Sequence, residues 1–182
     1  MGRGRKNEKR RCVDKMTSVS LLFVAILAGT VLGCDPGWKS FGKNCYAFVD
    51  RPEPWAAAIQ YCEALGASLV RIDDQNELRF LQQILRAHYK ANDITQPIIE
   101  FWTAGNDIIV DGSWVWAPDN EPMEFAPWGP GEPNDLRIGK DDCAALFNRA
   151  DFNLNDDNCN ENRFFICETR AKRSNCQTPR NW

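Results

Sequence analysis

The apolar positions that follow residue 36 predict a hairpin and then a helix. Phe41, Tyr46 and Phe48 stand on either side of the turn-forming triplet Gly42-Lys43-Asn44, as expected for two short paired strands. Beyond Pro54, apolar residues recur at spacings of 4, 3 and 3 until Gly66, which is typical of one face of a helix. The residues on this face are Trp55, Ile59, Cys62 and Leu65.

A short strand and a second helix come next. Residues 68–72 are predicted to form the strand. Asp74, with Glu77 three residues later, matches a capping box, in which two side chains satisfy the free backbone donors at a helix start. The apolar stripe of this helix is formed by Leu78, Leu81, Leu85 and His88. We therefore interpret His88 as the edge of a packed stripe and not as a catalytic base.

From residue 97 the pattern changes to short apolar strands between loops rich in Pro, Gly, Asn and Asp. Strands are predicted at residues 98–104, 143–147 and 163–168, with a fourth candidate at 113–116. Residues 117–142 form an irregular stretch that is longer than a compact domain usually contains, and long ordered loops often carry function. The whole pattern predicts the α+β class, with one domain.

The N-terminal segment differs from the rest of the chain. Residues 1–33 contain seven Lys and Arg, and residues 16–34 carry no charge. A basic stretch followed by the apolar run 21–32 is typical of a signal peptide, with Val31 and Gly33 before the cleavage point. We expect cleavage after Gly33 and secretion of the protein.

Two other interpretations of this segment remain open. It could be a type II membrane anchor, although a spanning helix needs about 20 apolar residues and several polar residues interrupt this run. It could also be a bacterial lipoprotein signal, since Val31-Leu32-Gly33-Cys34 fits that pattern and would place a lipid on Cys34.

The net charge of the mature chain disfavours nucleic acid as a binding partner. Cleavage removes seven of 22 basic and two of 25 acidic residues, which leaves 15 basic and 23 acidic residues in the mature chain. An acidic chain is a poor binder of nucleic acid, because phosphate binding needs clustered Lys and Arg. Clustered carboxylates instead suit a hard cation such as calcium.

The cysteines indicate disulfide bonds. Cys12 leaves with the leader, and seven cysteines stay: Cys34, Cys45, Cys62, Cys143, Cys159, Cys167 and Cys176. In an exported domain an odd number suggests three internal bridges and one further thiol, whereas spacing alone does not choose the pairing. Because Cys176 lies in the polar tail 171–182, we expect it to link a homodimer. Zinc is disfavoured, since there is no Cys-x₂-Cys pair and only one histidine.

One set of motifs carries a resemblance to a known family. In chain order the motifs are Cys34 and Cys45, Phe101-Trp102-Thr103-Ala104-Gly105, Trp114 and Trp116, Glu132-Pro133-Asn134, and Asn155-Asp156 before Cys159. This order resembles the C-type lectin domain of the mannose-type, Glu-Pro-Asn subclass over residues 34–168. The resemblance implies two helices flanking small antiparallel sheets, a long calcium-binding loop, and a carbohydrate-recognition domain at 34–170. It also implies the bridges Cys34–Cys45, Cys62–Cys167 and Cys143–Cys159.

The residues themselves favour a calcium site. Calcium takes 6–8 oxygen ligands and accepts amide oxygens beside carboxylates. Such a mixture is offered by Glu132, Asn134, Asn155 and Asp156, and a cis Glu132-Pro133 bond would direct the flanking oxygens to one point. By resemblance Asp141 is a fifth ligand, one methylene shorter than the glutamate usual in the family. A second, auxiliary ion is expected at Asp107, Asp111, Asp135 and Asp142, with solvated loop acids as the alternative.

The same five residues, Glu132, Asn134, Asp141, Asn155 and Asp156, are expected to hold the sugar. A sugar hydroxyl can coordinate calcium, donate to a carboxylate and accept from an amide N–H, so Glu132 with Asn134 sets an order of donors and acceptors. The resemblance implies mannose, N-acetylglucosamine and fucose-type ligands. Trp128 is interpreted as a packing residue. The rival hypothesis is a lectin-like module that binds protein or another ligand without calcium-dependent sugar binding, and no nucleophile or base constellation indicates an enzyme.

Overall fold

The computed structural model describes residues 31–91, 93, 95, 97–136 and 141–174 of the 182-residue chain. It divides into two units, residues 34–171 and a second unit that combines residues 1–33 with 172–182. In the second unit, strand β1 (Val31–Gly33) pairs antiparallel with β11 (Lys172–Ser174). Neither strand is predicted from the sequence, which assigns these residues to the leader and to a polar tail. Cys176 and residues 1–30 lie outside the described residues.

Helix α1 (Trp55–Ala64) begins directly after Pro54, which is its N-cap residue. Its buried side chains are Trp55, Ala58 and Cys62. Leu65, predicted on this face, is 48% exposed because the helix has already ended and Leu65 is the C-cap. The chain then turns at Gly66, whose φ of +69° favours glycine.

Helix α2 (Gln75–His88) has the predicted cap in a modified form. The Asp74 carboxylate accepts from the backbone N–H groups of Asn76 (2.6 Å) and Glu77 (2.9 Å). The Glu77 carboxylate accepts from the N–H of Asp73 (2.8 Å), so it reaches beyond the capping residue. The predicted burial of His88 is wrong: it lies at the last helical position, where the stripe has left the core, and it is exposed.

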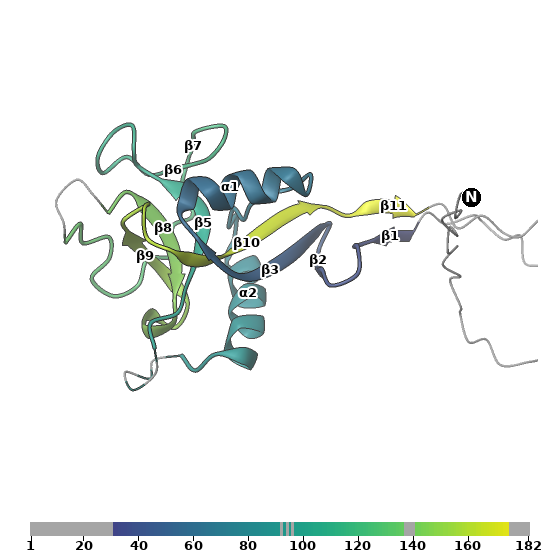
Figure 1. The fold of residues 1–182 in the computed structure, drawn as a ribbon, viewed down its shortest axis with the longest axis horizontal. Helices are drawn as coiled ribbons and strands as arrows, with labels where there is room; N and C mark the ends of the chain where they lie inside the picture. The colour runs from purple at the N-terminus through teal and green to yellow at the C-terminus, as the bar shows by residue number, and fades with distance from the viewer. Residues whose placement is uncertain (1–30, 92, 94, 96, 137–140, 175–182) are drawn as a thin grey trace, which may run out of the picture. The chain divides into compact units, whose positions relative to one another are not determined.

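The strands of the larger unit are short and join into one sheet in the described part of the chain. They are β2 (Lys39–Phe41), β3 (Asn44–Glu53), β4 (Ser68–Leu69), β5 (Glu100–Asn106), β6 (Val115–Trp116), β7 (Glu121–Pro122), β8 (Cys143–Phe147), β9 (Asn153–Asp157) and β10 (Arg163–Arg170). The order β2-β3-β10-β5-β6-β7 forms the main path, and β8 joins β5 to β9. Figure 1 shows α1 and α2 on opposite sides of the β3–β10 pair.

The sheet differs from the antiparallel prediction at one pairing. β10 and β5 run parallel, with Phe164 opposite Phe101 and Phe165 opposite Trp102. Parallel neighbours need a long crossover connection, and the segment from β6 to β9 provides one between these two strands. The fold is therefore two helices with a mixed sheet.

Other strand predictions hold with shifted bounds. The strand predicted at 68–72 ends at Leu69, although Val70 still hydrogen-bonds through its N–H to Ile166 O (2.8 Å) and through its carbonyl to Ala104 N (2.8 Å). β7 and β9 are not predicted, and both lie in stretches rich in polar residues.

The core and the disulfides tie the elements together. The largest fully buried side chains include Trp102, Phe101, Phe165, Leu146 and Leu154, which come from β5, β8, β9 and β10. All three implied bridges are confirmed: Cys34–Cys45, Cys62–Cys167 and Cys143–Cys159. Cys143–Cys159 joins the start of β8 to the segment after β9, and β9 carries part of the predicted calcium site.

Candidate functional site

The loop that carries the Glu-Pro-Asn triplet is anchored on β9. The N–H of Leu154 donates to Pro127 O (2.9 Å), and the N–H of Gly129 donates to Leu154 O (2.8 Å). The half-buried Trp128 packs edge-on against Trp114, with ring centroids 4.6 Å apart. Trp128 is thus a packing residue, as predicted, and it fixes the base of the loop.

Gly129 allows the loop to approach β9 closely. A Cβ atom at this position would lie 2.7 Å from the Ala150 Cβ and 3.3 Å from the Leu154 carbonyl oxygen. The first distance is shorter than real Cβ contacts, so any side chain here would push the loop away from β9.

The predicted sugar-binding triplet meets Asp156 at the end of this loop. The Glu132-Pro133 bond is cis, as predicted. The buried Asp156 carboxylate accepts two backbone N–H groups, from Asn134 (3.0 Å) and from Asp135 (2.6 Å). The Asn134 side-chain amide in turn donates to the Glu132 carboxylate. The structure therefore brings Glu132, Asn134 and Asp156 together from two segments, in which Asn134 and Asp156 are 22 positions apart.

The carboxylates of Glu132, Asp141 and Asp156 lie close enough to affect one another's charge. Burial, followed by the neighbouring Asp156 and Asp141 carboxylates, raises the pKa of Glu132 to about 7. Asp141 is itself buried, so its charge acts through protein more than through water. A cation placed among the three groups would reverse this effect, because an opposite charge favours the ionised form.

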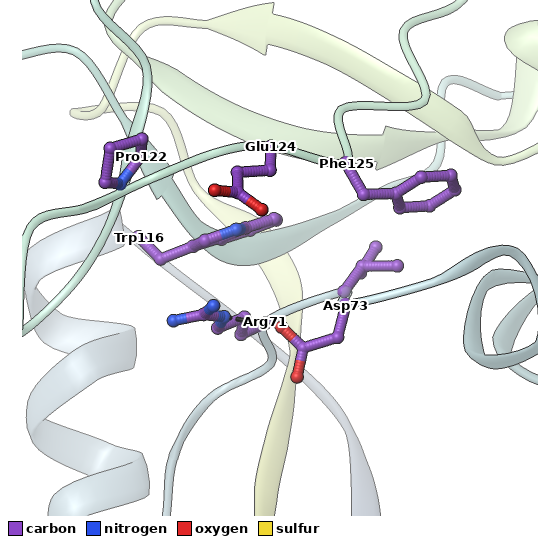
Figure 2. A pocket seen from close by; sticks show the side chains of 7 residues that line it. Arg71, Asp73, Trp116, Pro122, Glu124 and Phe125 are labelled. Atoms are coloured by element: carbon purple, nitrogen blue, oxygen red, sulfur yellow. Dashed lines mark hydrogen bonds and ion pairs between the residues drawn. The ribbon is translucent and has the colours of Figure 1, made fainter.

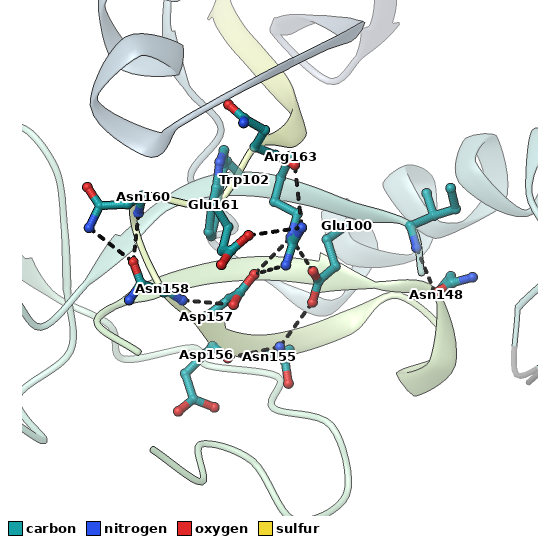
Figure 3. Close-up of polar contacts among 12 residues, drawn as sticks. Glu100, Trp102, Asn148, Asn155, Asp156, Asp157, Asn158, Asn160, Glu161 and Arg163 are labelled. Atoms are coloured by element: carbon teal, nitrogen blue, oxygen red, sulfur yellow. Dashed lines mark hydrogen bonds and ion pairs between the residues drawn. The ribbon is translucent and has the colours of Figure 1, made fainter. Parts of the chain in front are cut away.

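Asn155 is oriented by residues that the sequence does not single out. Its side-chain amide nitrogen donates to Glu100 Oε1 (3.1 Å) and to the Asp156 backbone oxygen (2.9 Å). Arg163 pairs with Glu100 and also with Asp157, whose Oδ2 lies 2.6 Å from Nη2. Figure 3 shows this network, with the Asn155 nitrogen towards Glu100 and its amide oxygen pointing away. The available sequence signal was a single carboxylate at the start of the otherwise uncharged stretch 100–106.

The predicted auxiliary acids also lie near one another. The N–H of Asp107 donates to the Asp142 carbonyl oxygen (3.1 Å), and Asp107 Oδ2 accepts from the N–H of Gly112 (2.8 Å). Asp107 Oδ1 is buried and has no hydrogen-bond partner among the described residues. Burial and then Asp142 and Asp111 raise the pKa of Asp107, and burial with Asp135 and Asp111 raises that of Asp142.

The donors fit a hard cation. The predicted main set combines carboxylates with the amide oxygens of two asparagines, which is the mixture that calcium accepts. A buried carboxylate oxygen without a donor, as at Asp107, is costly unless a cation or water satisfies it. In the described part of the chain, however, three or more His, Cys, Asp and Glu side chains do not converge as a ready metal site.

A separate hollow lies away from these residues. It has a volume of about 310 Å³ and is lined by Arg71, Ile72, Asp73, Trp116, Pro122, Glu124 and Phe125. Figure 2 shows its lining side chains, among them Arg71, which pairs with Asp73 and Glu121. The Arg71 charge is thus already matched by two carboxylates.

Sequence comparison places the chain in a family. The family model for the Lectin C-type domain matches residues 51–169. The chain belongs to the C-type lectin domain family. Ladderlectin of Oncorhynchus mykiss is 32% identical over 126 residues, which cover 69% of this chain and 62% of ladderlectin, so the C-type lectin chain spans about three fifths of that relative.

Solved structures of C-type lectin domains agree with the fold. The cow CD23 C-type carbohydrate-recognition domain, in the presence of a GlcNAc2Man3 oligosaccharide, has a TM-score of 0.64 at 29% identity and covers 78% of this chain and 99% of its own. A calcium-independent type II antifreeze protein has the same TM-score at 26% identity, with 78% and 98% covered. Among the residues that the structure describes, no helix is long and apolar enough to cross a membrane.

Proposed function

We propose that this C-type lectin domain binds glycans in a calcium-dependent manner, with mannose, N-acetylglucosamine or fucose-type sugars as ligands. The observation that carries the proposal is the Asp156 carboxylate, which holds the Asn134 and Asp135 N–H groups and so keeps Glu132 and Asn134 beside β9. An ordinary surface turn at Glu132-Pro133-Asn134 would not need the buried Asp156 carboxylate, which comes from a second segment of the chain. Glu132, Asn134, Asp141, Asn155 and Asp156 are the proposed calcium ligands.

The chain's own residues account for the binding of calcium and for the recognition of the sugar. A calcium ion held here would supply open positions for two adjacent sugar hydroxyls. Glu132 is an acceptor for one hydroxyl proton, and Asn134 is a donor to a hydroxyl oxygen, so the pair recognises one order of donors and acceptors. Glu132, Asp141 and Asp156 would repel one another less with an ion between them, which would couple calcium binding to the order of the loop.

Several further properties belong to the same proposal. The auxiliary acids Asp107, Asp111, Asp135 and Asp142 would hold a second calcium ion, for which the buried Asp107 Oδ1 is the supporting feature. The protein would be a secreted binding protein and not an enzyme, with glycans as its partners. Cys176 would link two chains, so that two weak sites act on one glycan surface.

The rival function is binding without calcium, as the name of the antifreeze neighbour illustrates for the same fold. Two departures from the usual motif bear on it: Leu154 stands before Asn155 in place of a tryptophan, and Asp141 is shorter than glutamate. Leu154 is fully buried and anchors the loop through its backbone, so its effect is on packing. Asp141 is buried, and its charge contributes to the raised pKa of Glu132. Asp141 therefore lies close to the proposed site despite its shorter side chain.

A glycan array read in calcium and again in chelator tests the proposal. We expect mannose-type glycans to bind only in calcium, and Glu132→Gln to remove the signal. Glu121→Gln is a matched control, because Glu121-Pro122 is another Glu-Pro pair of the chain and lies in β7, outside the proposed ligand set. Binding that is equal in calcium and chelator would favour the rival function, and equal loss in both variants would show a general folding defect.

A further inference from the structure

Glu100 lies behind the proposed calcium site and not in it. It opens β5, it is only 4% exposed, and its Oε1 accepts from the Asn155 side-chain amide nitrogen at 3.1 Å. Its other carboxylate oxygen pairs with Arg163, which has 24% of its side chain exposed. A buried carboxylate in contact with one arginine and one asparagine amide is fixed in position by both.

The hydrogen bonds of Asn155 leave its amide only one orientation. The two N–H bonds of the side chain go to a carboxylate oxygen of Glu100 and to the backbone oxygen of Asp156. A carbonyl oxygen can only accept, and so can the ionised carboxylate, which is the form of Glu100 that pairs with Arg163. A flipped amide would place its oxygen against two acceptors and lose both bonds. The Asn155 oxygen therefore points away from Glu100, in the same direction in Figure 3 as the Asp156 carboxylate.

This orientation matters because calcium binds oxygen and not an amide N–H₂ group. An asparagine that is free to flip would present nitrogen for part of the time and would have to be ordered when the ion binds. Metal-ligand side chains are commonly oriented by a neighbouring carboxylate, and loss of such a partner typically costs about 10–100-fold in metal affinity.

We propose that Glu100, held by Arg163, is a positioning residue that sets the Asn155 amide with its oxygen towards the calcium ion. The proposal rests on the proposed function, since it assumes that Asn155 is a ligand. Arg163 serves two carboxylates at once, because it also pairs with Asp157 at the end of β9. The ion-pair network thus joins the starts of β5 and β10 to the strand that carries Asn155 and Asp156.

The test is a calcium titration of the whole secreted protein by calorimetry, with Glu100→Gln as the first variant. Arg163 can only donate, so the oxygen of the introduced glutamine turns to Arg163 and the glutamine N–H₂ group faces Asn155. The Asn155 amide then flips, and nitrogen replaces oxygen at the ion. We expect calcium affinity to fall at least tenfold, while melting in chelator still shows a folded protein.

Glu77→Gln is the matched control. Glu77 is also a buried carboxylate, bonded to the Tyr46 hydroxyl and the Asp73 N–H, but it lies at the start of α2 and does not contact the site. It should lose stability in chelator and keep its calcium affinity within about twofold, given the context dependence of such values.

A rescue variant separates orientation from general damage. In Glu100→Gln with Asn155→Asp, the N–H₂ group of the introduced glutamine donates to the introduced aspartate, which offers its second carboxylate oxygen to the ion, and total charge equals that of the wild type. Asn155→Asp alone sets two carboxylates against each other and should weaken binding. We expect the double variant to bind calcium more tightly than either single variant.

The outcomes are distinct. Wild-type calcium affinity in Glu100→Gln, or a double variant no better than the two single variants, overturns the role of Glu100 and leaves the proposed function intact. If Glu100→Gln does not fold, the double variant is compared with Asn155→Asp alone, and equal or weaker binding by the double variant overturns the proposal. A wild-type protein that binds no calcium overturns both proposals.

Discussion

Replacing Glu168 by Gln should make the stability of the domain less dependent on pH. Glu168 lies in β10, and its carboxylate accepts from the Asn44 side-chain amide and from the Arg71 N–H (3.2 Å). Burial, and then the nearby Glu77 carboxylate, raise its pKa from a usual value of 4.5 to about 7. The folded protein therefore holds a proton at a pH where the unfolded chain has already released it.

The sign of the effect follows from this difference. Stability from the protonated carboxyl is fully present below about pH 4.5 and is lost as the pH rises through 7. One pKa unit corresponds to about 1.4 kcal/mol, so for a rise from 4.5 to about 7 the loss amounts to at most about 3.5 kcal/mol. Gln keeps the shape of the carboxyl and carries no charge. The variant should match the wild type at low pH and be more stable by up to that amount above pH 7.

The assay is unfolding in urea, followed by tryptophan fluorescence, between pH 4 and 8 in the presence of chelator. Carboxyls with raised pKa values that do not act on Glu168, such as Glu132, act equally in both proteins and cancel in the difference between the two curves. Glu63→Gln on the exposed side of α1 is the control for the removal of one glutamate carboxylate. The reasoning is refuted if the Glu168→Gln difference is constant across this range.

Three further predictions concern the binding site and assembly. In Gly129→Ala the added Cβ would lie 2.7 Å from that of Ala150, so the variant should displace the loop and lower sugar affinity about tenfold. Sugar titration measures the affinity, and circular dichroism checks that the fold is retained. Unchanged affinity would contradict the close packing of the loop. Glu132→Gln with Asn134→Asp should shift competition from mannose towards galactose while calcium stays bound, and continued preference for mannose would contradict the donor–acceptor order. Non-reducing electrophoresis should show a dimer that Cys176→Ser abolishes. A monomer unchanged by reductant would contradict a disulfide-linked dimer.

The sequence predicted the elements whose patterns are local. Both helices, the strands 143–147 and 163–168, and the capping role of Asp74 depend on nearby apolar spacing and backbone chemistry, and the structure confirms them. β9 was missed because Asn153–Asp157 is polar, and it is a strand through its pairing with β8. The parallel contact of β5 with β10 was missed for a related reason, since local spacing carries no information on which distant strands meet.

The candidate site divides in a similar way. Motif order identified Glu132, Asn134 and Asp156, and the structure brings them together through two backbone bonds to Asp156 and one bond from the Asn134 amide to Glu132. The Glu100–Arg163 pair was beyond prediction, because the two residues are 63 positions apart and each alone resembles an ordinary strand end. The close approach of Gly129 to β9 was equally hidden, since it depends on the position of Ala150.

Calorimetric titration of the purified protein with methyl α-mannoside tests the central claim most directly. With calcium at saturation, we expect binding with a dissociation constant on the order of 10⁻³ M, or about −4 kcal/mol, as for one monosaccharide at a single site. Removal of calcium by chelator should abolish the heat of binding, and added calcium should restore it. Sugar binding of equal strength in chelator, or its absence at saturating calcium for mannose, N-acetylglucosamine and fucose alike, would contradict the account.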